Sequence, residues 1–273
     1  MEATIFKGRE TRDGAGVRLT RIFGNDRAHL TDPFLLLDHF GSDDPADNLR
    51  GFPRHPHPGI ETETYMLEGE AEHGDSLGNA GVIGPGDLQW MTAGSGIVHQ
   101  EMPKPRDGRM YGFQLWVNLP ARAKMMPPRY RDISSRELPV VADGGATIKV
   151  IAGELGRVRG PVRDLVVETE YLDVALEAGA SFAFPVRPGR TAFCYLYEGR
   201  AEVSGRQLDA HHLLLTRGAK SLDLVASAPS RCILVAGAPL GEPIAWGGPI
   251  VMNTREELEL AFRELDEGTF IKK

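Results

Sequence analysis

Cysteine is scarce in this chain, and long apolar runs are missing. The 273 residues include two cysteines, Cys194 and Cys232, each in an apolar context, so we expect buried reduced thiols rather than a disulfide framework. No apolar run approaches the roughly 18 residues that a membrane span needs. The N-terminus lacks the apolar core of a secretory signal. We therefore expect a soluble cytoplasmic protein without a membrane partner.

Basic runs are missing as well, which bears on nucleic-acid binding. The chain has 31 Lys and Arg against 38 Asp and Glu, a net charge of −7, and no Lys/Arg stripe. Nucleic-acid surfaces normally carry such a stripe, so we expect no direct nucleic-acid partner. The 32 Gly and 19 Pro are spread along the chain. That distribution is typical of many short strands joined by tight turns.

Histidines and carboxylates gather between Phe52 and Glu101. His55 and His57 stand two positions apart, and so do His99 and Glu101. Side chains two apart on a strand point to the same face, so each pair aims in one direction. If the two strands are neighbours, three imidazoles and one carboxylate converge. This donor set suits a divalent first-row metal and leaves open positions on a six-coordinate ion.

A second carboxylate competes for the fourth ligand position. In strict strand alternation, Glu61 and Glu63 share the face of His55 and His57. The spacing by itself therefore leaves the choice between Glu61 and Glu101 open.

An internal repeat indicates two domains of one architecture. Residues 65–72 (YMLEGEAE) align with residues 195–202 (YLYEGRAE), and such self-similarity is typical of a duplicated unit. The same register places Pro185 opposite His55 and Arg187 opposite His57. The second copy is therefore expected to lack metal ligands.

Several motifs in the chain resemble the pirin family. The resemblance extends nearly end to end and rests on Asp38-His39-Phe40, His55-Pro56-His57, residues 86–94 (GDLQWMTAG), His99-Gln100-Glu101-Met102 and residues 246–254 (WGGPIVMNT). It implies an all-β bicupin, in which two tandem antiparallel β-barrels of the jelly-roll (cupin) type are followed by a short C-terminal helix.

The resemblance also implies a ligand set. Many cupins use a glutamate placed like Glu61, but pirin-like proteins use the glutamate two residues past the third histidine, which is Glu101. Glu101 is thus expected to join the three histidines, with Arg54 and Glu61 around the site. One iron(II) ion per chain is implied, although the donors would also accept other first-row metals. Pro58 stands where the family often has a basic residue, so a substrate contact near the pocket mouth is expected to be missing.

Domain boundaries follow from the repeat and from a proline-punctuated connector at residues 118–131. We expect an N-terminal metal-binding barrel at residues 1–130, a second barrel without ligands at 131–250, and a tail at 251–273 that packs on a barrel. Thr254 and Glu257 form a capping box in the tail. Apolar residues then recur at helical spacing up to Gly268.

The resemblance implies two classes of function. One is a metal-dependent dioxygenase with quercetin 2,3-dioxygenase-type ring cleavage of a flavonol-like aromatic substrate by O2, in which Glu101 receives the proton of the substrate hydroxyl. The other is a non-enzymatic, metal-dependent regulator that binds a protein partner, either a transcription factor or a metabolic enzyme. A cupin isomerase or small-molecule binder is a third reading. The sequence does not separate the first two, because both need the same four ligands.

Overall fold

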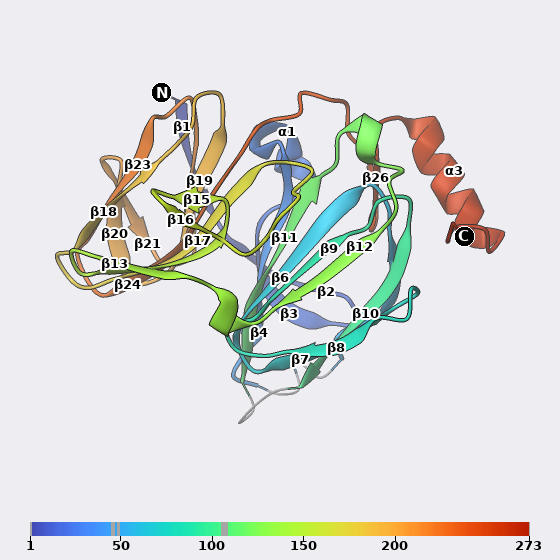
Figure 1. The fold of residues 1–273 in the computed structure, drawn as a ribbon, viewed down its shortest axis with the longest axis horizontal. Helices are drawn as coiled ribbons and strands as arrows, with labels where there is room; N and C mark the ends of the chain where they lie inside the picture. The colour runs from blue at the N-terminus through green and yellow to red at the C-terminus, as the bar shows by residue number, and fades with distance from the viewer. Residues whose placement is uncertain (1, 45–46, 48–49, 105–108, 273) are drawn as a thin grey trace. The chain divides into compact units, whose positions relative to one another are not determined.

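The structure is a computed structural model that describes residues 2–44, 47, 50–104 and 109–272. Two compact units make up the chain, and each contains a seven-stranded and a four-stranded antiparallel sheet (Figure 1). The first-barrel unit comprises Glu10–Ala28, Phe34–Ser135 and Leu240–Lys273, and the second-barrel unit comprises Met1–Arg9, His29–Pro33 and Arg136–Pro239. The predicted all-β, two-barrel architecture is confirmed.

The first-barrel unit contains both strands of the predicted metal site. Its large sheet has the order β12 (Arg129–Ile133), β9 (Leu88–Thr92), β6 (Ile60–Glu68), β11 (Met110–Asn118), β4 (Phe34–Ser42), β3 (Val17–Phe23) and β2 (Arg9–Asp13). Its small sheet has the order β5 (Phe52–His57), β10 (Ile97–Lys104), β7 (Glu70–Asp75) and β8 (Ala80–Ile83). The short elements are η1 (Asn25–Arg27), α1 (Ala28–Thr31), η2 (Ala121–Ala123), η3 (Ser135–Glu137), β25 (Ala245–Gly247) and β26 (Ile250–Met252).

The second-barrel unit repeats this plan. Its large sheet has the order β1 (Glu2–Lys7), β22 (His212–Arg217), β19 (Thr191–Glu198), β24 (Ser230–Gly237), β17 (Thr169–Leu176), β14 (Ala146–Ala152) and β13 (Val140–Asp143). Its small sheet has the order β18 (Ser181–Pro185), β23 (Ser221–Ala226), β20 (Arg200–Val203) and β21 (Arg206–Asp209), and β15 (Glu154–Leu155) pairs with β16 (Val158–Arg159).

The two barrels differ in what fills them. In the second barrel, alternate residues of facing strands form one large apolar cluster that includes Phe182, Phe184 and both cysteines, which are buried and unbridged. Arg187, the residue opposite His57 in the repeat, is half-exposed and places its Nε 3.0 Å from Glu170 Oε1. The second barrel therefore has a packed apolar core, and its counterparts of His55 and His57 are the exposed Pro185 and Arg187.

The compact units differ from the expected boundaries at three places. Strand β1 at the N-terminus pairs with β22 of the second barrel. Residues 129–133 pair as β12 with β9, so the expected connector remains in the first-barrel unit. Residues 240–272 also belong to that unit. These assignments depend on edge-strand pairing across long stretches of chain, which local periodicity does not specify.

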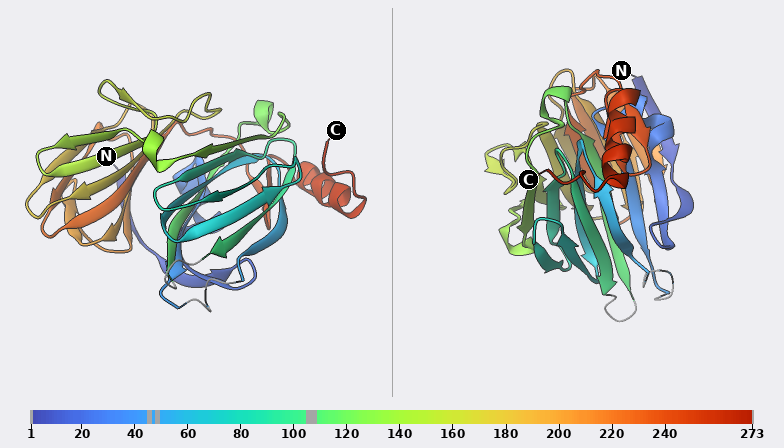
Figure 2. Two further views of the ribbon diagram at one scale, coloured as in Figure 1. Left: turned by 60° about the horizontal axis from the view of Figure 1, so that its bottom comes forward. Right: turned by 90° about the vertical axis from the view of Figure 1, so that its right-hand side faces the viewer.

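The tail forms a short strand and then the predicted helix. Helix α3 (Arg255–Asp266) begins at Thr254, whose side chain accepts from Glu257 N while the Glu257 carboxylate accepts from Thr254 N. This capping box is confirmed. Ala261 and Phe270 bury apolar surface against Ile250 of β26, and Figure 2 shows the red helix on the outside of its barrel. Within the described chain, no helix combines the length and apolar character that crossing a bilayer requires.

Candidate metal centre

The three predicted histidine ligands come together in the first barrel. His55 and His57 lie on β5, His99 lies on β10, and the two strands pair so that His99 is opposite His55. One ring nitrogen of each histidine lies within 4.8 Å of the others. They are the three donors that form such a group among the described His, Cys, Asp and Glu residues. The expectation that the two strands are neighbours is confirmed.

Backbone carbonyls orient two of these rings. His55 Nδ1 lies 2.8 Å from Pro53 O, and His57 Nδ1 lies 2.9 Å from Pro249 O. A carbonyl accepts only, so each Nδ1 carries the proton and each Nε2 keeps its lone pair for a metal. The Nε2 atoms of His55 and His99 are 2.9 Å apart. Two nitrogens that each lie about 2 Å from one ion, at right angles, would be separated by about 3 Å, so the donors fit a first-row divalent ion.

Burial keeps His57 and His99 neutral. His57 is 2% exposed, and its burial, followed by its proximity to His55, lowers its pKa to about 3. Burial is also the main cause that holds the pKa of His99 well below its usual range, and neighbouring histidines add to it. A metal binds the neutral imidazole. The site is therefore ready to accept an ion without first losing protons from these two rings.

Glu101 lies in the same cavity but outside the group of three nitrogens. Its Oε1 accepts a hydrogen bond from Thr64 Oγ1 at 2.7 Å, and its side chain is largely buried. Thr64 Oγ1 also lies 3.0 Å from Gln114 Oε1. Because Thr64 has one hydroxyl proton, donation to Glu101 requires Gln114 to rotate its amide and donate to Thr64. Gln114 thus belongs to the same hydrogen-bond network as Glu101.

Glu61 and Glu63 do not share the face of the histidines. Strand β5 ends at His57 and β6 begins at Ile60, and Gly59 between them has a φ of 75°. This left-handed turn breaks the alternation on which the expectation relied. Glu61 Oε1 instead accepts from Thr92 Oγ1 at 2.6 Å, and burial raises the pKa of Glu61 and, more strongly, of Glu63.

A cavity of about 630 Å³ opens beside the histidines. Its apolar lining includes the side chains of Leu19, Leu36, Phe40, Phe52, Trp116 and Trp246. Its polar lining includes Asp13, Arg21, Asp38, Arg54, His55, His57, Glu101 and Gln114. The volume and the few polar groups among apolar walls are typical of a small-molecule site. Trp116 and Trp246 belong to the apolar wall.

The C-terminal segment completes the site. Pro249 holds His57 as described above, and Trp246 packs on Trp116 with ring centroids 5.7 Å apart. Trp116 in turn meets His57 edge-on at 5.0 Å. Sequence reasoning did not find these contacts, because no local pattern joins residues so far apart in the chain. The WGGPIVMNT run itself was the signal that the segment had a specific role.

A buried lysine ties this segment to the turn after His57. Lys124 Nζ donates to Gly59 O at 2.8 Å, to Asn118 Oδ1 at 2.7 Å and to Val251 O at 3.1 Å. Burial lowers the pKa of Lys124 to about 8. Its three acceptors use all three ammonium protons, which is why a cation can remain buried here.

Comparison with known proteins places the chain in one family. The sequence matches the Pirin family model over residues 16–117 and the Pirin C-terminal cupin domain model over residues 171–271. A pirin-like protein of Caulobacter vibrioides is 51% identical over 97% of both chains, and human pirin is 39% identical over 95% of this chain and 91% of its own. A crystal structure named quercetin 2,3-dioxygenase from Acinetobacter baumannii superposes with a TM-score of 0.91 at 33% identity, over 98% of this chain and 96% of that chain. The chain therefore belongs to the pirin family.

Proposed function

We propose that this protein is an iron(II)-dependent dioxygenase that opens a ring of flavonol-like substrates. The observation that carries the proposal is the grouping of three histidine nitrogens beside an aromatic-lined cavity of about 630 Å³ that also contains Glu101. The Acinetobacter baumannii structure named quercetin 2,3-dioxygenase supports the reaction class. Iron(II) is proposed from the family resemblance, and Glu101 is proposed as the fourth ligand.

Different side chains of the cavity have separate roles in the proposed reaction. The indole rings of Trp116 and Trp246 offer flat apolar walls to a planar substrate. An iron(II) ion, held by the three histidines and Glu101, would supply Lewis acidity and a redox partner for dioxygen. Thr64 holds Oε1 of Glu101, which directs the carboxylate to accept the proton of the substrate hydroxyl. The buried, apolar surroundings limit the water that competes with the substrate.

The test is anaerobic reconstitution with iron(II), followed by oxygen uptake with quercetin. We expect uptake and ring opening by the wild-type protein, and loss of both stoichiometric metal and uptake in His57→Ala. His29→Ala is the matched control, because His29 is exposed and lies outside the donor group. Its metal content and uptake should equal those of the wild type.

Two outcomes would contradict parts of the proposal. Full metal occupancy in His57→Ala would show that His57 is not a ligand. Metal bound one to one by the wild type without any oxygen uptake would argue against the enzyme and favour the regulatory alternative, in which the metal stabilises a surface for a protein partner.

A further inference from the structure

The cavity contains two arginines in different electrostatic states. Arg21 is saturated: its Nε donates to Asp38 Oδ1 at 2.9 Å, and its Nη2 donates to Asp38 Oδ2 at 2.7 Å and to Asp13 Oδ2 at 2.6 Å. Arg54 also lines the cavity and is exposed, yet it makes no hydrogen bond or ion pair with any residue in the described part of the chain. Arg54 is thus the cavity cation whose charge the protein leaves uncompensated.

A β-bulge accounts for the position of Arg54. On β10, two steps separate His99 from Glu101, but their partners on β5 are His55 and Phe52, three steps apart. One extra residue is therefore inserted into β5, in the two positions before His55. Regular alternation would send the side chain before His55 to the face away from the metal centre. Bulges beside active sites redirect side chains in this way, and here Arg54 belongs to the lining of the cavity together with His55 and His57.

We propose that Arg54 selects aromatic substrates that carry a second acidic group, a carboxylate, in addition to the hydroxyl that approaches the histidines. The inference rests on the proposed function and deepens it. A guanidinium presents paired N–H donors that match the two oxygens of a carboxylate. Phe52 precedes Arg54 by two residues and forms part of the apolar wall. A flat ring against that wall would bring a carboxylate on its outer edge toward the cation.

The test uses two ligands of the same shape: a flavonol with a 4′-carboxylate and the same flavonol with a 4′-carboxamide. Zinc-loaded protein prevents turnover, and quenching of the fluorescence of Trp116 and Trp246 reports binding. We expect the wild type to bind the carboxylate roughly 2- to 5-fold more tightly than the amide, the range for an exposed ion pair. The preference should weaken at high ionic strength.

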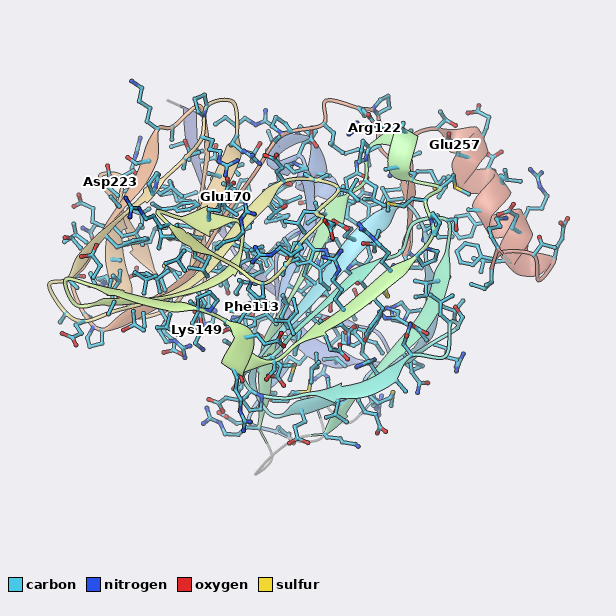
Figure 3. The ribbon with its side chains drawn as sticks, viewed as in Figure 1. Phe113, Arg122, Lys149, Glu170, Asp223 and Glu257 are labelled. Atoms are coloured by element: carbon cyan, nitrogen blue, oxygen red, sulfur yellow. The ribbon has the colours of Figure 1, made fainter. Side chains whose placement is uncertain are left out.

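The variant Arg54→Gln should bind both ligands with equal affinity, and Arg54→Lys should retain part of the preference. The matched control is Arg122→Gln, because Arg122 is an exposed arginine on η2 (labelled in Figure 3) that does not line the cavity. This control should keep the wild-type preference.

The outcomes separate this inference from the proposed function. Equal affinity of the wild type for both ligands, or a preference that survives in Arg54→Gln, overturns the role of Arg54 and leaves the dioxygenase proposal standing. Failure of both ligands to quench at all would mean that the cavity does not take a flavonol, which overturns both. A preference that disappears only in the Arg54 variants supports the proposal.

Discussion

At the scale of single residues, burial determines which groups of the site carry charge. His57 and His99 are almost fully buried and neutral, and Asp38 stays close to Arg21 although its own burial raises its pKa to about 6. A neutral imidazole can bind a metal ion. At acid pH, however, a histidine that stays neutral in the folded state lowers the free energy of unfolding, because the unfolded chain binds the proton. The change of the unfolding free energy with pH therefore reports the protonation state of the buried histidines.

The metal-free protein should lose stability as the pH falls from 7 to 6. In the unfolded chain His57 has its ordinary pKa of 6.5, whereas in the folded chain its pKa is about 3. Between these values the unfolded state binds more protons, so the free energy of unfolding decreases with falling pH. His99 acts in the same direction. We expect a decrease of about 1 kcal/mol from these two rings, measured by urea denaturation with chelator present.

Protonation of Asp38 changes the unfolding free energy in the opposite direction, and this limits the pH range in which the histidines can be measured. Its folded pKa of about 6 exceeds its ordinary 3.8, so below pH 6 the folded state binds more protons there and offsets part of the loss. The effect of the histidines on the unfolding free energy is therefore measured best above pH 6. In His57→Asn the decrease should be about half as large. A decrease in His57→Asn that equals the decrease in the wild type would contradict a neutral buried His57, because the buried carboxyl groups with raised pKa act alike in both proteins.

The choice of the fourth ligand can be tested with one pair of conservative variants. If Glu101 binds the metal, Glu101→Gln should weaken metal affinity at least about tenfold, because a charged donor is replaced by a neutral amide. Glu61→Gln should leave affinity nearly unchanged, since Glu61 bonds to Thr92 outside the donor group. Competition with a chromophoric chelator measures both. The reverse ranking would assign the site to Glu61.

At the scale of secondary-structure elements, the site depends on two features outside the regular strand pattern. The bulge in β5 places Phe52 opposite Glu101, and Arg54 within this bulge lines the cavity. The β25–β26 pair brings Pro249 to His57 and Val251 to Lys124. A tail segment thus determines the tautomer of a residue nearly two hundred positions earlier.

Lys124→Met should destabilise the first-barrel unit by about 2 kcal/mol or more. The substitution leaves the carbonyls of Gly59 and Val251 and the amide of Asn118 without their donor in a buried place. Chemical denaturation measures the effect. The matched control is Lys104→Met, which removes an exposed ion pair with Glu72 and should cost less than about 1 kcal/mol. Equal losses of unfolding free energy in the two variants would contradict a stabilising role of the three buried hydrogen bonds of Lys124.

At the scale of the whole molecule, the two barrels share one architecture but differ in their interiors. The first-barrel unit has a cavity with converging polar groups, whereas the second barrel fills its interior with apolar side chains. The counterpart of His57 is the half-exposed Arg187, which pairs with Glu170. A filled barrel contributes stability but no room for an ion.

The protein should therefore bind one metal ion per chain. Reconstitution followed by elemental analysis and protein quantification should give a ratio close to one, because the described donor group lies in the first barrel alone. A ratio of two would contradict the reading of the second barrel as ligand-free. Arg187→Ala should leave the ratio unchanged, since it alters the repeat position of His57 without touching the donor group.

Much of this molecule followed from the sequence by itself. Spacing two apart predicted that His55 and His57 share a face, and the repeat predicted a second barrel without ligands. The capping box at Thr254 predicted the start of α3. These features are local or repetitive: strand alternation, turn signals and helix caps depend on neighbours within a few residues, so they can be read along the chain.

The tertiary structure decided the rest. A single left-handed turn at Gly59 removed Glu61 from the face of the histidines, and one inserted residue in β5 interrupts the alternation beside Arg54, which lines the cavity. The pairing of β1 with β22 and the contact of Pro249 with His57 join residues from distant parts of the chain. Alternation has a period of two, so one irregular residue reverses every later assignment. Contacts between distant segments leave no periodic trace in the sequence, because they are selected by packing and by the need to satisfy buried polar groups.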